Sequence, residues 1–221
     1  MDLGIQLYGP IANGSMNFRD LMAGLKNVAA MLLLVGCDQR QESVKGGTAA
    51  DFAEMMAQAK NGDALSAYNV AVKYLTGDGV ARNEHEGFEW MSRAAYAGEP
   101  NAQFNLGVMY ARGDHVPQSA TDAVKWYRLA AEKGMAEAQF NLGLILYFGQ
   151  GVRRDRNEAA KWFLQAAKAG VAKAQYYAGD CCYVGFGVPK DREAAISWYC
   201  KSAAQGVEAA KRRLKEIGVS L

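Results

Sequence analysis

The sequence predicts an all-α protein, an α/α solenoid in which helix-turn-helix repeats stack into a right-handed superhelix. The first observation is a period. The four tryptophans of this 221-residue chain lie 36 residues apart: Trp90, Trp126, Trp162 and Trp198. The second observation is that glycines keep the same step, at positions 77, 113, 149 and 185 and at positions 98, 134, 170 and 206. A period of this length indicates stacked units that bury their apolar faces against their neighbours.

Residues 101–136 illustrate one repeat. Apolar residues at helical spacing predict a first helix: Ala102, Leu106 and Tyr110. Gly113 ends that helix, because glycine accepts a left-handed backbone, and Thr121 or Asp122 can cap the next helix. A second apolar stripe follows and ends at a glycine: Ala123, Trp126, Tyr127, Ala130, Ala131 and Gly134. We therefore expect a helical hairpin whose tryptophan lies in the core.

The repeat period divides the chain into segments. Four repeats are predicted at residues 63–98, 99–134, 135–170 and 171–206. A half-repeat helix over residues 49–62 precedes them, and a C-terminal capping helix over residues 207–221 follows. Residues 1–36 form a signal-like N-terminal segment, and the polar, glycine-containing residues 37–48 are typical of a flexible tether.

The repeat pattern resembles the Sel-1-like repeat family, which is related to tetratricopeptide repeats. The best copy begins with AEAQFNLG at residues 136–143 and continues through GQGV at 149–152 to Trp162. The resemblance covers residues 63–206 and implies tetratricopeptide-like hairpins. The second repeat has His115 where the others have glycine, and the first has Ala71 and Gly87 where the others have glycine and alanine. These departures put local loop geometry and packing in question.

Residues 22–37 are typical of a secretory signal. Lys26 precedes an apolar stretch of eight residues, 28–35, which is too short to span a bilayer. The stretch ends Leu34-Val35-Gly36-Cys37, which looks like the lipobox of bacterial lipoproteins, a family cleaved before the cysteine and acylated on it. The resemblance implies that Cys37 is lipidated and anchors the chain. The alternative is a short buried helix with an ordinary free cysteine.

A lipidated Cys37 would place the chain at the bacterial cell envelope, facing the periplasm. Asp38 in the second mature position resembles the inner-membrane retention signal of enteric bacteria. If the signal is misinterpreted, the protein is instead secreted or cytoplasmic.

Composition and charge exclude several classes of function. Apolar residues make up 50%, and the net charge is only +2, so we expect no nucleic-acid binding. The one basic cluster, Lys211 to Lys215, fits a solvated face of the last helix. The spacing of Cys181, Cys182 and Cys200 favours free thiols, and His85 and His115 lack ligand-spaced partners, so no metal site is expected.

A ligand groove is expected along the first helices, where the related tetratricopeptide superhelix binds peptides. One column before the Leu-Gly pair is amide-rich: Asn69, Asn105, Asn141 and Tyr177. The preceding column is aromatic: Tyr68, Phe104, Phe140 and Tyr176. One turn or two further along lie Arg112, Tyr147 and Tyr183. Amides can bond an extended backbone and aromatics dominate binding hot spots. Alternatively, these residues only pack one repeat on the next.

These patterns predict a non-catalytic scaffold, a monomer that binds an unidentified protein or peptide as an adaptor or assembly factor. An inhibitor or immunity protein that blocks a partner enzyme is the alternative. A hydrolase acting on β-lactams or peptidoglycan, as described for some relatives, is a third hypothesis. No serine has a lysine three residues on, as serine acylation by β-lactams usually requires, so we expect no catalytic residue and no cofactor.

Overall fold

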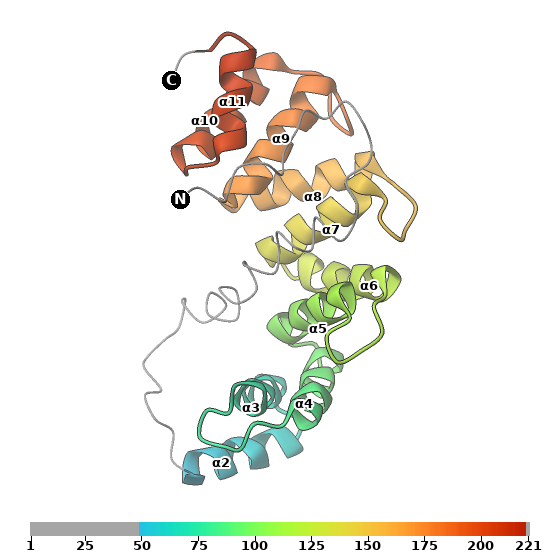
Figure 1. The fold of residues 1–221 in the computed structure, drawn as a ribbon, viewed down its shortest axis with the longest axis vertical. Helices are drawn as coiled ribbons and strands as arrows, with labels where there is room; N and C mark the ends of the chain where they lie inside the picture. The colour runs from blue at the N-terminus through green and yellow to red at the C-terminus, as the bar shows by residue number, and fades with distance from the viewer. Residues whose placement is uncertain (1–48, 220–221) are drawn as a thin grey trace, which may run out of the picture. The chain divides into compact units, whose positions relative to one another are not determined.

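The computed structural model describes residues 49–219, which form ten helices and no strand (Figure 1). Their bounds are α2 Ala49–Lys60, α3 Ala64–Thr76, α4 Glu84–Tyr96, α5 Pro100–Arg112, α6 Ala120–Glu132, α7 Ala136–Phe148, α8 Arg156–Lys168, α9 Ala172–Val184, α10 Arg192–Ala204 and α11 Glu208–Glu216. The predicted all-α solenoid of helical hairpins is confirmed. The predictions on residues 1–48, among them Cys37 and Asp38, lie outside the described residues.

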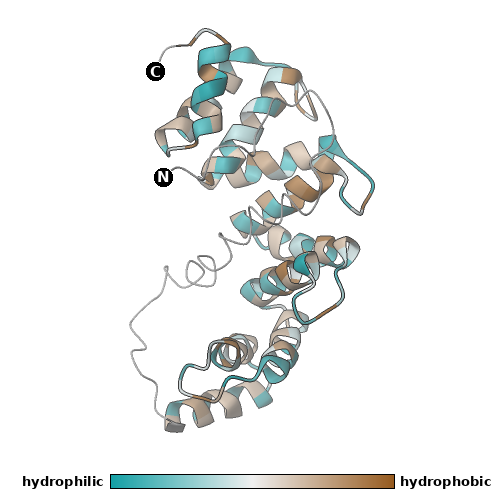
Figure 2. Cartoon of the chain, viewed as in Figure 1, coloured by the Kyte–Doolittle hydropathy of each residue, from teal (hydrophilic) through white to brown (hydrophobic). Residues whose placement is uncertain are grey.

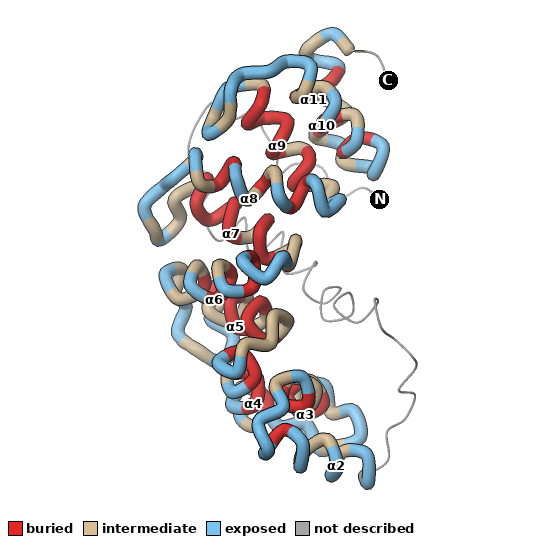
Figure 3. The backbone as a smooth tube through the Cα atoms, turned by 180° about the vertical axis from the view of Figure 1, so that it is seen from behind, coloured by how far each residue is buried: buried red, intermediate tan, exposed pale blue. Residues whose placement is uncertain are grey.

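The helices alternate between two roles. The first helices of the four hairpins are α3, α5, α7 and α9, and the second helices are α4, α6, α8 and α10. Helices adjacent in the chain make the main packing contacts, as expected for a quasi-one-dimensional stack. Buried backbone runs along the first helices, while the connecting loops are largely exposed (Figure 3).

Most helix ends follow the sequence signals, but α6 is capped by Ser119 and not by the predicted Thr121 or Asp122. Each second helix begins at a polar cap whose side chain accepts a backbone N–H: Asn83, Ser119, Asp155 and Asp191. The first helices of the four hairpins end at glycines in the left-handed conformation: Gly77, Gly113, Gly149 and Gly185. Ser119 therefore performs the capping role that aspartate has in the third and fourth repeats.

The residue after each tryptophan places a large side chain in the core. Four side chains there are at most 2% exposed: Met91, Tyr127, Phe163 and Tyr199. Trp90 and Trp126 are buried, but Trp162 and Trp198 are only half-buried, so the structure places two of the four predicted core tryptophans at the surface. A ring can reach the core at the next position because the facing helix carries a glycine: a Cβ added to Gly107 would lie 2.8 Å from the Tyr127 ring.

The exchanged residues of the first repeat compensate one another. Met91 replaces the ring of the other repeats, so Ala71 fits where they need glycine. On the partner helix, a Cβ on Gly87 would lie 2.6 Å from Leu75, so that position must be small. The departure noted in the sequence is a local repacking that leaves the hairpin intact.

His115 takes over the conformation of a glycine. Among the described residues it is the one non-glycine with positive φ, at 63°, close to 69° for the equivalent Gly151. Its ring Nδ1 lies 3.5 Å from the Glu84 carboxylate, at the start of the preceding second helix. The loop therefore keeps its shape despite the substitution, at some conformational cost.

Candidate binding surface

One stripe of the first helices is left partly uncovered in the first two repeats. It consists of four positions at i, i+4, i+7 and i+11, which share one helix face. We call it the first-helix stripe: Leu65, Asn69, Val72 and Thr76 in α3; Asn101, Asn105, Val108 and Arg112 in α5; Glu137, Asn141, Leu144 and Phe148 in α7; Lys173, Tyr177, Asp180 and Val184 in α9. In α3 and α5 all eight side chains are half-buried or exposed.

The predicted asparagines lie on this stripe and link successive repeats. Asn69, Asn105 and Asn141 are half-buried. The Asn105 amide donates to the Tyr68 hydroxyl at 3.5 Å, and Asn141 hydrogen-bonds with Tyr127. The amide column therefore has a packing role, which was the alternative left open by the sequence, and its half-buried side chains still reach the surface.

The predicted aromatic and cationic groove residues divide into two groups. Phe104, Phe140, Tyr147 and Tyr177 are buried, whereas Tyr68, Tyr176, Tyr183 and Arg112 are half-buried. The Tyr177 ring stacks on Phe163 at 4.8 Å, and Phe104 lies 5.7 Å from Tyr127. The buried rings fill the core between helices, so of these residues only the half-buried group is accessible on or beside the stripe.

A buried carboxylate closes the stripe in the last repeat, a feature that the sequence analysis missed. Asp180 is 4% exposed and occupies a column that is aliphatic in the other repeats: Val72, Val108 and Leu144. The Tyr199 hydroxyl donates to its Oδ1 at 2.7 Å, and the Arg213 guanidinium of α11 lies 3.3 Å from the same oxygen. An arginine in the asparagine column of α11 was the available signal.

Electrostatics around Asp180 are governed by desolvation. Burial raises the pKa of Asp180, while the Tyr199 hydrogen bond and the Arg213 charge oppose that rise. Burial also raises the pKa of Tyr199 and that of Tyr176, which has Asp180 among its charged neighbours. Arg213 is thus turned inward, whereas its neighbours Arg212 and Lys215 are exposed on α11, as predicted for a solvated face.

A glutamine column holds consecutive repeats together. The amide nitrogens of three buried glutamines donate to the carbonyl oxygen near the end of the preceding second helix: Gln103 to Ala95 at 3.1 Å, Gln139 to Ala131 at 3.1 Å and Gln175 to Ala167 at 3.3 Å. Each of these carbonyls also accepts the backbone N–H of the glycine that follows the helix, so the amide adds a second hydrogen bond that joins one repeat to the next.

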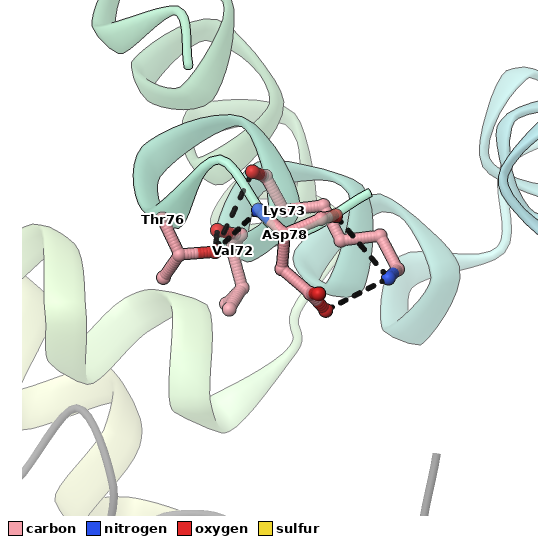
Figure 4. Close-up of polar contacts among 4 residues, drawn as sticks. All are labelled: Val72, Lys73, Thr76 and Asp78. Carbon is pink, nitrogen blue, oxygen red and sulfur yellow. Dashed lines mark hydrogen bonds and ion pairs between the residues drawn. The ribbon is translucent and has the colours of Figure 1, made fainter. Parts of the chain in front are cut away.

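Beside the stripe of the first repeat lies a buried lysine with a fixed partner. Lys73 is 8% exposed, and its Nζ lies 3.1 Å from the Asp78 carboxylate in the following loop (Figure 4). The Thr76 hydroxyl donates to the Val72 carbonyl at 2.8 Å and is 3.4 Å from the Asp78 backbone N–H (Figure 4). The network orders the end of α3 next to Val72 and Thr76.

The described part of the chain offers little reactive chemistry. Cys181, Cys182 and Cys200 are free, in agreement with the sequence, and burial raises the pKa of Cys181 to about 12, which keeps its thiol protonated. No group of three metal-ligating side chains occurs within residues 49–219. None of the helices over the same range has the length and apolar character needed to cross a bilayer.

Comparison with known proteins agrees with the repeat architecture. The Sel1 repeat family matches residues 64–99, 100–135, 136–171 and 172–207, each one residue later than the predicted unit. A Sel1 repeat protein from Oxalobacter formigenes is 27% identical, with a TM-score of 0.67, over 90% of this chain and 84% of that one.

A second solved structure is closer in sequence. A protective antigen of uropathogenic Escherichia coli with an SLR fold is 35% identical over 74% of this chain, with a TM-score of 0.67, and the chain spans 35% of its length. No curated protein matches the chain. With four matched repeats that together cover more than half of its residues, the chain belongs to the Sel1 repeat family.

Proposed function

We propose that this Sel1 repeat scaffold binds a protein or peptide segment along the first-helix stripe of its first two repeats, as an adaptor or assembly factor of the bacterial cell envelope. The observation that carries the proposal is the composition of that stripe in α3 and α5: two asparagines in the same column, two valines in another, and Arg112 as the one charged residue. Aliphatic surface flanked by amides suits an extended backbone with small apolar side chains.

Closure of the stripe in the last two repeats limits the site to the first two. Leu144, Tyr177 and Asp180 are each at most 9% exposed, whereas the asparagines and valines in the same columns of α3 and α5 are half-buried. The ligand therefore contacts the stripe of α3 and α5, and the tyrosines and Asp180 of α9 support the scaffold. This narrows the predicted groove to Asn69, Asn105, Tyr68 and Arg112 together with the two valines.

Site-specific crosslinking in the native envelope tests the proposal. A photoreactive residue at position 72 or 108 should capture a partner, while the same residue at Leu129 should not. Leu129 is 42% exposed on the second helix α6 and serves as the aliphatic control outside the stripe. Capture from position 129 alone would place the binding surface on the second helices and exclude the stripe.

Two double substitutions test how the ligand contacts the stripe. Val72→Glu combined with Val108→Glu introduces two charges into the stripe and should weaken the captured interaction by about ten-fold or more, because a charge facing an apolar segment loses solvation. Asn69→Ala combined with Asn105→Ala should also weaken binding of an extended ligand. Nanomolar binding of a folded enzyme that survives both double substitutions would favour the inhibitor or immunity alternative.

We further propose that Cys37 is acylated and tethers the scaffold to the membrane, on the inner membrane as Asp38 suggests. The support is the Leu34 to Cys37 sequence and the apolar stretch before it. Cys37→Ser expressed in a bacterial host should abolish metabolic labelling with a fatty acid and should move the protein out of the membrane pellet. Unchanged labelling of the variant would end this part of the proposal.

A further inference from the structure

The turns that lead from a second helix to the next first helix carry unbalanced positive charge in the last two repeats. Residues 165–173 and 201–212 contain five basic side chains, which we call the basic turn edge: Lys168, Lys173, Lys201, Lys211 and Arg212. Glu208 is the one acidic residue in these two segments, and it pairs with Lys211 at 2.8 Å. Four cations therefore remain without an acidic neighbour in either segment.

Side-chain hydrogen bonds hold the two turns next to each other. Gln205 donates to the Gly170 carbonyl at 3.1 Å, and the Ser202 hydroxyl donates to the Ala172 carbonyl at 2.7 Å. Lys168, Lys173, Lys201 and Arg212 are exposed, and Lys211 is half-buried. The strongly hydrophilic character of α11 is visible in Figure 2. The five cations thus share one edge of the stack.

The basic residues of these turns do not recur at the equivalent positions of the preceding repeats. In the two preceding repeats the position of Lys168 is held by Tyr96 and Glu132, and that of Lys173 by Asn101 and Glu137. These positions lie at helix ends, where solvent-exposed residues are free to vary without affecting the core. Packing therefore does not explain why the last two turns are basic.

A half-buried aromatic ring lies at the same edge. The Lys201 ammonium sits 4.5 Å from the centroid of the Trp198 ring. Tryptophan combines an apolar ring with one N–H donor and is favoured at the headgroup level of bilayers.

Four of the five cations are lysines, compact point charges that suit a diffuse array of anions, whereas recognition of individual carboxylates favours the arginine fork.

We propose that the basic turn edge lies against an anionic phospholipid surface. Helix-to-helix turns project from the ends of the helices, so several of their cations can approach a plane together, and the Trp198 ring can enter the headgroup layer beside them. An acidic protein or a nucleic acid is a different partner, which the test separates. The proposal depends on neither the first-helix stripe nor acylation of Cys37.

Vesicle sedimentation tests the proposal on the full chain carrying Cys37→Ser, so that no acyl chain can account for binding. The probes are vesicles of equal parts phosphatidylglycerol and phosphatidylcholine, and vesicles of phosphatidylcholine alone. Binding is expected only to the first kind and should weaken with salt, as expected for surface electrostatics. Reversal of three charges, Lys168→Glu, Lys173→Glu and Lys201→Glu, should reduce partitioning by about ten-fold or more, because each basic residue near such a surface contributes roughly five-fold.

The matched control reverses three charges at the opposite ends of the helices. Arg153→Glu, Arg154→Glu and Lys190→Glu change the net charge equally, and these residues are exposed in the loops between first and second helices. Circular dichroism verifies that both triple variants remain helical. Partitioning should persist in the control variant. Equal loss in both variants, no binding to phosphatidylglycerol vesicles, or tighter binding to polyglutamate or duplex DNA would overturn the proposal.

Discussion

Gly143 and Phe163 pack so closely that position 143 has no room for a Cβ atom. A Cβ on Gly143 of α7 would lie 2.7 Å from the ring of Phe163 on α8, and Phe163 has no exposed surface. The same relation joins Gly179 to Tyr199 at 2.5 Å. The hairpin is thus closed by a ring lying directly on the backbone of the facing helix.

Gly143→Ala should destabilise the protein by about 2 kcal/mol, because the added methyl forces the ring or the helix to shift in a well-packed core. Urea unfolding followed by circular dichroism measures the change. The first repeat, with Ala71 and Met91, shows the compensating pair. Phe163→Met should therefore cost less in the Gly143→Ala background than in the wild type, and additive effects in the double variant would contradict the assigned contact.

His115→Gly should stabilise the protein by about 1 kcal/mol, because glycine adopts a positive φ without the steric cost that a side chain incurs. The change also removes the contact with Glu84, a partly exposed pair of small value. His115→Ala is the control: it loses the same contact and keeps the steric cost. A thermal or urea midpoint that rises equally in both variants would mean that the backbone conformation is not the cause.

Asp180 should give the protein a distinctive dependence of stability on pH. Burial raises its pKa in the folded state above the ordinary value of 3.8, so its contribution to stability is complete below about pH 4 and is lost as pH rises through the folded value. Asp180→Asn cannot ionise. The variant should therefore gain stability relative to the wild type as pH rises from about 4 to 7. A relative loss over that range would show that attraction by Arg213 outweighs desolvation.

Gln139→Ala should cost about 1 kcal/mol, since it removes a buried hydrogen bond to the Ala131 carbonyl, which keeps the Gly134 backbone N–H as its donor. Denaturant unfolding measures the loss, and Gln165→Ala, at an exposed position of α8, serves as the control and should be nearly neutral. An equal effect at both positions would mean that the glutamine column contributes through helix propensity alone.

The sequence by itself determined the architecture, because the 36-residue period ties tryptophans, glycines and caps to one repeating hairpin. It also predicted free thiols at Cys181, Cys182 and Cys200 and a solvated face on the last helix, but not that Arg213 of that helix turns inward. It assigned all four tryptophans to the core, yet the residue after each tryptophan is more deeply buried than the tryptophan itself. The repeat period identifies equivalent positions, but it does not show how much of each side chain is exposed to solvent.

Only the tertiary structure decided which residues border the first-helix stripe. Phe104 and Phe140 share a column with Tyr68 and Tyr176, but the first two are buried and the others are half-buried. How deeply a side chain is buried depends on the residues of the neighbouring repeats, and a column of equivalent positions does not contain that information. The pairing of Asp180 with Arg213 likewise joins residues 33 positions apart. The carboxylate of Asp180 in an otherwise aliphatic column is explained only when the structure shows that Arg213 of α11 lies beside it.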